Sequence, residues 1–170
     1  MAPMPGRPRW ARIIDARGAD GESAPISPLH MFAATLTRRV RFAAAHRYRR
    51  PEWSDAKNAE VFGACAHPAY HGHTYVCDVT VAGPIDPMTG FVVDLGILDR
   101  VLATEVTTRF DHRNINVDVP EFADGRLVPT GENLARFIFE RVAAALGTAA
   151  TVTQVRVSED DSLAVTYSTR

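Results

Sequence analysis

The chain has 170 residues, a length that suits one domain with a buried core. Its net charge is −1 at pH 7, with 46% hydrophobic and 23% charged residues, so the composition does not favour a nucleic-acid partner. No apolar run approaches the roughly 18 residues of a transmembrane helix. Only two cysteines occur, Cys65 and Cys77, which favours a reducing, cytoplasmic location over a secreted disulfide framework.

Residues 1–30 are rich in proline, arginine and glycine and show no hydrophobic periodicity. Two interpretations remain open for them. They form a flexible N-terminal extension, or they are an upstream extension of the reading frame and translation begins at Met31. In both cases we expect the folded domain to comprise residues 31–170 and the chemistry to lie within it.

A first strand is predicted over about residues 32–47, where apolar side chains alternate and His46 continues their face. Tyr48 to Pro51 ends this strand. A short helix is expected over about residues 55–62, with Ser54 as its N-cap and Gly63 at its C-terminal exit.

The second strand runs to Ala82 and is preceded by His71-Gly72-His73. Alternation puts His71 and His73 on one face, about 6.6–7 Å apart at Cα. Two such imidazoles can share a metal ion, although a solvated or core-satisfied pair is the commoner reading of this motif alone. If the two strands pair, His46 lies opposite them. Three neutral imidazoles leave a fourth zinc position open, as in catalytic zinc sites.

The remaining predicted elements are a short strand, two helices and a closing hairpin. In order, the sequence predicts a short strand over 91–93, an amphipathic helix of about 14 residues after Asp94, a polar loop over 110–125, a helix capped by Thr130 and closed by Gly147, and a hairpin of strands 151–159 and 163–169. Strands in pairs with helices between them indicate an α+β domain with both helices on one face of an antiparallel sheet.

Several polar residues outside the histidines have two possible interpretations. Cys65 is either a small buried residue or a thiol that a nearby metal activates. Asp111-His112 is either a turn pair or a carboxylate that orients an imidazole. Glu159 ends a strand, and Glu132 lies in the first turn of a helix, where an acid is favourable for the helix dipole alone.

Seven ordered segments of the sequence resemble the 6-pyruvoyltetrahydropterin synthase/6-carboxytetrahydropterin synthase family over about residues 35–170. They are Phe42-Ala-Ala-Ala-His46, Asn58-Ala-Glu-Val-Phe-Gly-Ala-Cys65, His71-Gly-His73, Ile85-Asp-Pro-Met-Thr-Gly90, Asp111-His112, Thr130-Gly-Glu-Asn133 and Glu159.

The resemblance implies the tunnelling fold, or T-fold, in which a four-stranded antiparallel sheet carries two helices on one face. In this family the sheets of three subunits close into a barrel, and two trimers commonly stack into a hexamer. Such closure removes the sheet edges that a lone four-stranded sheet exposes.

The resemblance also implies a zinc-dependent lyase that converts 7,8-dihydroneopterin triphosphate to 6-pyruvoyltetrahydropterin and releases triphosphate. The implied roles are zinc ligands (His46, His71, His73), proton-transfer residues (Cys65, Asp111, His112) and substrate-binding residues (Thr130, Glu132, Glu159). In the family, the pair matching Asp111-His112 acts across a subunit boundary. Gly131 stands where relatives often have a second threonine or a serine, so one hydroxyl of the pocket is missing.

Two alternative functions remain open. A 6-carboxytetrahydropterin synthase of the queuosine pathway uses the same substrate and releases acetaldehyde and triphosphate. Those relatives often have three residues between the cysteine and the His-Gly-His motif, whereas this chain has Ala66 to Tyr70 there, which favours the pyruvoyl type. A non-catalytic zinc- or pterin-binding protein is the alternative of another class. Retention of Cys65, Asp111 and His112 together speaks against it.

Overall fold

The computed structural model describes residues 34–169, so the expected N-terminal extension over 1–30 lies outside the described residues. The elements are β1 (Ala34–His46), α1 (Asp55–Phe62), the 3₁₀ turn η4 (Gly63–Ala66), β2 (His71–Gly83), α2 (Leu95–Leu102), the π turn η5 (Ala103–Thr107), α3 (Thr108–Phe110), β3 (Arg113–Asn114), α4 (Ile115–Asp118), the 3₁₀ turn η6 (Pro120–Phe122), α5 (Gly131–Leu146), β4 (Thr151–Ser158) and β5 (Ala164–Ser168).

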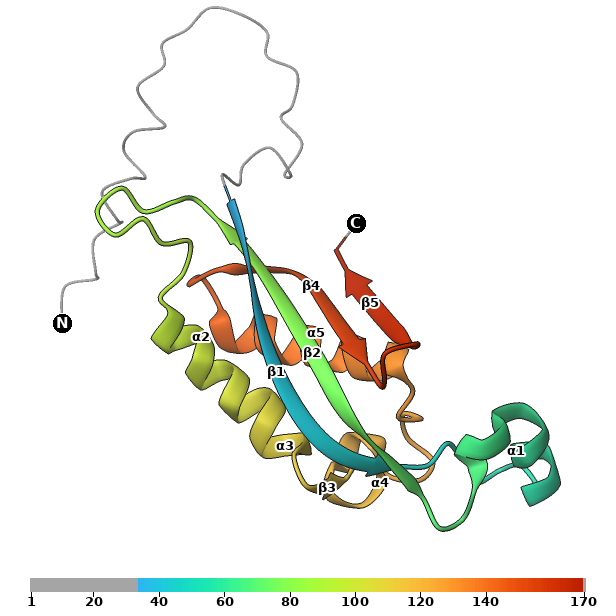
Figure 1. The fold of residues 1–170 in the computed structure, drawn as a ribbon. Coiled ribbons are helices and arrows are strands. Elements are labelled where there is room, and N and C mark those ends of the chain that lie inside the picture. The colour runs from blue at the N-terminus through green and yellow to red at the C-terminus, as the bar shows by residue number, and fades with distance from the viewer. Residues whose placement is uncertain (1–33, 170) are drawn as a thin grey trace, which may run out of the picture.

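One sheet organises the described residues, in the strand order β3-β1-β2-β4-β5. Its four main strands are antiparallel to their neighbours, as expected, and β1 and β2 form a ribbon of 13 residue pairs. The helices α2 and α5 lie across one face of the sheet, and α1 lies apart, at the end where β1 stops (Figure 1). This is the α+β architecture that the sequence predicts.

The core fills the space between the sheet and the two long helices. Alternate residues of the strands meet helical residues that recur every third or fourth position, and the most buried members on both sides are 0–1% exposed. They include Phe42, Tyr75, Val79 and Val155 from the sheet, and Leu98, Leu102, Leu134 and Ile138 from the helices.

The predicted helix caps are confirmed. The Ser54 side chain accepts a hydrogen bond from the Lys57 N–H, and the Thr130 side chain accepts one from the Asn133 N–H. Asp94 accepts from the N–H groups of Gly96 and Ile97. Each bond satisfies an amide that the first turn of a helix leaves without a partner.

The sheet has one strand more than the four that the family resemblance implies. The fifth strand, β3, is two residues long and pairs in parallel with Ala44 and Ala45 of β1. It falls within the segment 110–125 that the sequence indicates as a polar loop. That segment instead folds into short elements, because Ile115, Val119 and Phe122 are buried in the core while the polar residues between them face outward.

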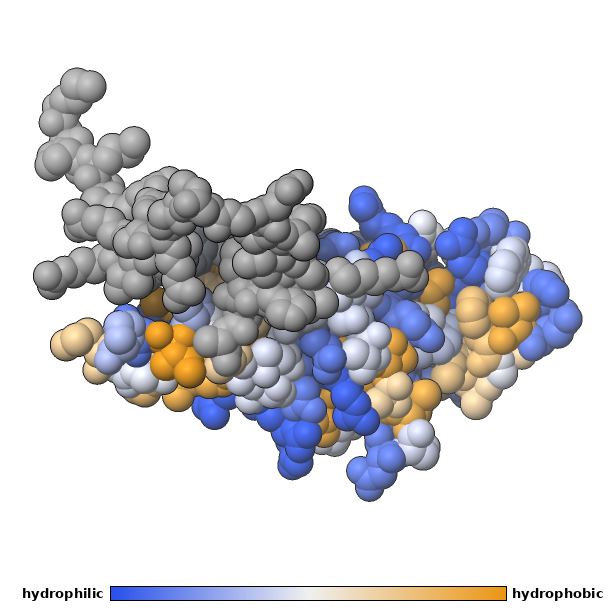
Figure 2. Space-filling model, turned by 90° about the horizontal axis from the view of Figure 1, so that it is seen from above, coloured by the Kyte–Doolittle hydropathy of each residue, from blue (hydrophilic) through white to orange (hydrophobic). Residues whose placement is uncertain are grey.

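The predicted strand over 91–93 is wrong. The carbonyl of Phe91 accepts a hydrogen bond from the Asp86 N–H at 2.9 Å, and the Gly90 N–H donates to the Asp86 carbonyl at 2.8 Å. These local bonds close a turn that takes no part in the sheet. Apolar side chains around this turn are exposed, and Met88 is 90% exposed. Figure 2 shows hydrophobic residues along this face of the molecule, at both of its ends, with hydrophilic residues between them.

The helix that follows Asp94 contains a wide turn. Its innermost side chains, Leu98, Leu102, Val106 and Phe110, are each 0% exposed and recur strictly every fourth residue. On a regular α-helix that spacing drifts by about 40° per step, since four residues exceed a turn of 3.6. The π turn over Ala103–Thr107 advances less per residue and so corrects the drift. Within this π turn, the Glu105 carboxylate accepts a hydrogen bond from Arg141 Nε of α5 at 2.9 Å.

Within residues 34–169, none of the helices has the length and apolar character that crossing a membrane requires.

Candidate active site

Three histidines converge at the end of the β1–β2 ribbon. The register pairs His46 with His71 and Ala44 with His73, so all three imidazoles lie on the helix-covered face of the sheet. One ring nitrogen from each lies within 4.8 Å of the other two. Gly72 lies between the two histidines, and a Cβ there would meet the Ala44 carbonyl oxygen at 3.0 Å. Gly72 therefore allows β1 to approach β2 closely between the two histidines.

The hydrogen bonds of His46 fix which of its nitrogens carries the proton. Its Nδ1 lies 3.1 Å from the Pro129 carbonyl oxygen, which can only accept. Nδ1 is therefore protonated, and Nε2 presents a lone pair to the cluster. The Tyr75 hydroxyl oxygen lies 3.0 Å from the same Nδ1, within hydrogen-bond distance. Such outer contacts orient imidazoles that bind metals.

The surroundings of His46 and His71 favour their neutral forms. Burial, together with the neighbouring His71 and His73, lowers the pKa of His46 to about 4, although the Pro129 carbonyl opposes the shift. Burial and His73 also lower the pKa of His71. Neutral imidazoles are the form that ligates metal ions.

One buried atom shows that the histidines suit a cation. His73 Nε2 is buried and has no hydrogen-bond partner among the described residues. His46 Nε2 and His71 Nε2 lie 3.0 Å apart, within hydrogen-bond distance of each other. An ion bound by all three nitrogens would satisfy His73 Nε2, since a buried polar atom without a partner carries a desolvation cost. The donor set therefore fits a metal with three imidazole ligands.

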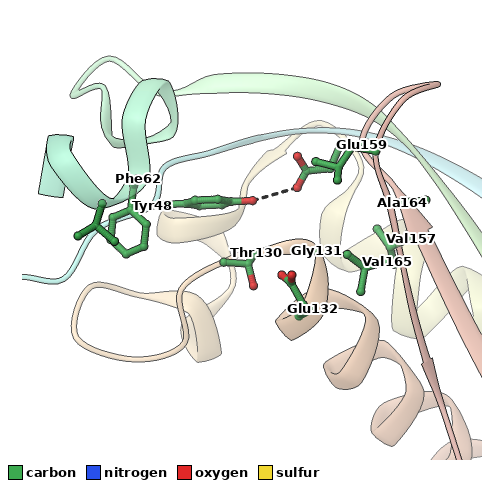
Figure 3. A pocket seen from close by; sticks show the side chains of 11 residues that line it. Tyr48, Phe62, Thr130, Gly131, Glu132, Val157, Glu159, Ala164 and Val165 are labelled. Carbon is green, nitrogen blue, oxygen red and sulfur yellow. Dashed lines mark hydrogen bonds between the residues drawn. The ribbon is translucent and has the colours of Figure 1, made fainter.

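A pocket of about 300 Å³ opens beside the histidines. It is lined by Thr130, Glu132 and Glu159, the three predicted substrate-binding residues, and Figure 3 shows their side chains around it. Glu159 is 6% exposed, and its Oε2 lies 3.9 Å from His73 Nε2. The carboxylate thus links the pocket to the histidine cluster.

Gly131 forms part of the wall of this pocket. A Cβ at that position would lie 3.0 Å from Val165 Cγ2, so β5 packs against the start of α5 where a side chain would otherwise stand. Val165 therefore occupies space that a side chain at position 131 would need, at the place where the sequence lacks a hydroxyl.

Cys65 lies in the η4 turn, and its side chain is half-buried. Its carbonyl accepts a hydrogen bond from the Tyr48 N–H at 2.7 Å, which ties the turn to the chain leaving β1. Burial and the negative charge of Glu159 raise the pKa of the Cys65 thiol. In this environment the thiol is protonated at neutral pH unless a positive charge joins the site.

Asp111 and His112 lie at a different edge of the sheet. Asp111 Oδ1 accepts from the Ala43 N–H at 2.8 Å, and the His112 N–H donates to the Ala43 carbonyl at 2.6 Å. His112 Nδ1 is 3.0 Å from Asp111 Oδ2, and the His112 side chain is 84% exposed. His112 also has a φ of 57°, an unusual conformation for a residue with a side chain. Within the described chain, no hydrogen bond joins this pair to Cys65 or to the histidine cluster.

Three groups of the site have no predicted role. Tyr48 reaches Glu159, while Tyr75 and the Pro129 carbonyl hold His46. The alternation that places His71 and His73 on one face also places Tyr75 there, so its position was readable from the sequence. A backbone carbonyl such as that of Pro129 leaves no comparable signal.

Neutral imidazoles that converge beside a carboxylate-lined pocket are characteristic of a metal-centred enzyme acting on a small molecule.

Comparison with known proteins identifies the family. The sequence model of the family described as 6-pyruvoyl tetrahydropterin synthase matches residues 35–170. A curated 6-pyruvoyl tetrahydrobiopterin synthase of Poecilia reticulata is 42% identical over 132 residues, which cover 78% of this chain and 88% of the relative. The chain belongs to the 6-pyruvoyl tetrahydropterin synthase family.

Two further relatives are informative. The solved structure of Caenorhabditis elegans 6-pyruvoyl tetrahydropterin synthase superposes with a TM-score of 0.75 at 34% identity, covering 81% of this chain and 96% of that chain. This likeness confirms the predicted T-fold of the subunit. A 6-carboxy-5,6,7,8-tetrahydropterin synthase of Bacillus subtilis is 32% identical over 121 residues, covering 70% of this chain and 72% of the relative.

Proposed function

We propose that this enzyme is a zinc-dependent lyase that converts 7,8-dihydroneopterin triphosphate to 6-pyruvoyltetrahydropterin and releases triphosphate. The observation that carries the proposal is the 3.9 Å approach of the Glu159 carboxylate to His73 of the histidine cluster. This distance lets one small molecule occupy the pocket with its ring and reach the three imidazoles with its side chain. The 42% identity to a protein named 6-pyruvoyl tetrahydrobiopterin synthase supports the same reaction.

In this proposal, His46, His71 and His73 hold the zinc ion. When bound, zinc would act as a Lewis acid toward the hydroxyl groups of the substrate side chain. The Pro129 carbonyl and the Tyr75 hydroxyl keep His46 Nε2 directed at the ion.

Glu159, Glu132 and Thr130 would bind the pterin ring. A carboxylate presents two oxygens at a spacing that accepts paired N–H donors, such as those of an amino-pyrimidine edge. The pocket excludes water on its apolar side through residues such as Phe62, Val157 and Val165.

Cys65 would remove protons from the substrate side chain, and Asp111-His112 would serve the remaining proton transfers. Because His112 is 84% exposed and no hydrogen bond among the described residues joins the pair to Cys65, we propose that the pair serves the site of a neighbouring subunit. Asp111 holds the His112 ring at 3.0 Å and so orients it toward such a partner.

The alternative activity is that of a 6-carboxytetrahydropterin synthase, and the 32% identity to the Bacillus subtilis protein supports it. A pterin- or zinc-binding protein without activity is the alternative of another class. Incubating the purified protein with 7,8-dihydroneopterin triphosphate separates the three. We expect triphosphate release and, by mass spectrometry, 6-pyruvoyltetrahydropterin. Release of acetaldehyde with a carboxy product would support the 6-carboxytetrahydropterin synthase activity. Absence of triphosphate release would support a protein that binds zinc or pterin without catalysis.

We further propose that the enzyme is a cytoplasmic homo-oligomer, a trimer or a dimer of trimers, whose folded domain comprises residues 31–170. Cys65 and Cys77 are free thiols, which suits a reducing compartment. The outer strands β3 and β5 are short and have unpaired edges among the described residues, so they can pair with other subunits.

Light scattering of the purified protein is expected to give a mass that is a multiple of three subunits. The physical reason is that closing the sheets of three subunits into a barrel leaves no open edge. A stable monomer with full activity would contradict this expectation.

A further inference from the structure

Tyr48 connects three parts of the site. It follows β1 by two residues, and its hydroxyl donates a hydrogen bond to Glu159 Oε1 at 3.0 Å. Its backbone N–H donates to the Cys65 carbonyl at 2.7 Å. Its ring meets the His46 ring edge-on with centroids 4.9 Å apart. A single residue is thus bonded to the pocket carboxylate and to the turn that carries the thiol.

The ring of Tyr48 is held so that its hydroxyl cannot easily leave Glu159. Phe62 of α1 packs edge-on against it at 5.9 Å, while His46 packs on it from within the sheet. Figure 3 shows the Tyr48 side chain extending across the pocket and ending at Glu159.

The Glu159 carboxylate is therefore held at one oxygen and open at the other. Oε1 accepts from Tyr48, whereas Oε2 lies 3.9 Å from His73 Nε2, beyond hydrogen-bond distance. Without the Tyr48 hydroxyl, Glu159 would be free to turn toward the histidines, where any bound cation would attract it. The carboxylate would then no longer present both oxygens to the pocket.

We propose that Tyr48 is a positioning residue for substrate binding, which acts by fixing the Glu159 carboxylate toward the pocket and away from the histidine cluster. The inference rests on the proposed pterin substrate. It concerns recognition of the ring and not the chemistry on the side chain. Since binding energy of this kind is common to the ground and transition states, its loss should appear in KM and not in kcat.

The test compares Tyr48→Phe with Tyr167→Phe. The first variant keeps the ring that packs on His46 and Phe62 and loses only the hydroxyl. The second removes a hydroxyl from β5, where Tyr167 packs on Phe139 outside the pocket. We expect Tyr48→Phe to raise KM for 7,8-dihydroneopterin triphosphate about tenfold, the effect of losing a hydrogen bond to a charged group, with kcat within about twofold of wild type. Tyr167→Phe should match wild type.

Fluorescence titration with neopterin measures the same interaction without turnover. We expect its dissociation constant to rise about tenfold in Tyr48→Phe, at unchanged zinc content. If KM and neopterin affinity were unchanged in Tyr48→Phe while the wild type was active, the role of Tyr48 would be overturned and the proposed function would stand. A fall in kcat at constant KM would overturn it as well. A wild type that releases no triphosphate and binds no neopterin would overturn the proposed function and this inference together.

Discussion

Replacing Cys65 with alanine should abolish most turnover while the zinc content and the oligomer size stay unchanged. Cys65 lies outside the set of histidines that can hold the metal, but near enough to Glu159 for that charge to raise its pKa. A dication at the histidines would act in the opposite direction and favour the thiolate. Removing a general base typically costs about 10²–10⁴-fold in rate, to be measured as triphosphate release.

Cys77→Ala is the matched control. Cys77 is 0% exposed on β2, and burial raises its pKa to about 12, so it stays a thiol and serves packing. Its loss should cost about 1 kcal/mol in the free energy of unfolding and little turnover. If Cys65→Ala kept near-native turnover while Cys77→Ala lost it with zinc bound, the base would be misassigned. If both variants stayed active, His112 would become the leading base.

Replacing His71 and His73 together with alanine should remove the metal. Wild-type protein purified without added metal is expected to carry about one zinc per subunit by elemental analysis, and the double variant close to none, since a single imidazole is too few ligands. Turnover should be lost with the metal. The fold should survive, because His46 and Tyr75 form the buried end of the cluster and are unchanged.

His67→Ala provides the comparison for this experiment. His67 follows the η4 turn near the cluster, but it does not belong to the group of convergent ring nitrogens. We expect this variant to retain its zinc and its activity. Full metal content in the double variant would refute the assigned ligand set, and metal loss in His67→Ala would show that the set is incomplete.

The sequence predicts well those parts of the fold that depend on local patterns. Alternation locates β1 and β2, and short polar caps such as Ser54 and Thr130 mark helix starts. The pairing of His46 with His71 follows once those two strands are taken as neighbours. Each inference needs only side-chain periodicity and the geometry of a strand or a helix.

Other features depend on contacts that no local pattern encodes. The two residues of β3 are too few to alternate, and Phe91 looks like a strand residue although its carbonyl is already bonded to Asp86. Tyr48 follows the end of β1, so its approach to Glu159, 111 positions later, depends on how α1 and β4 are placed. The positions of the side chains around the pocket therefore depend on contacts between segments that are far apart in the sequence.

The wide turn before Asp111 has a consequence for insertions and deletions. The extra residue in Ala103–Thr107 sets the angle at which the chain leaves the helix, and four residues after Thr107 the side chain of Asp111 accepts a hydrogen bond from the Ala43 N–H of β1. Deleting one residue inside this turn would return it to a regular α turn and leave Phe110 directed into the core. Inserting a residue, or deleting one elsewhere in the helix, would rotate every later helical side chain by about 100° and move Phe110 out of the core. This helix should therefore accept a one-residue deletion at the wide turn but not at other positions.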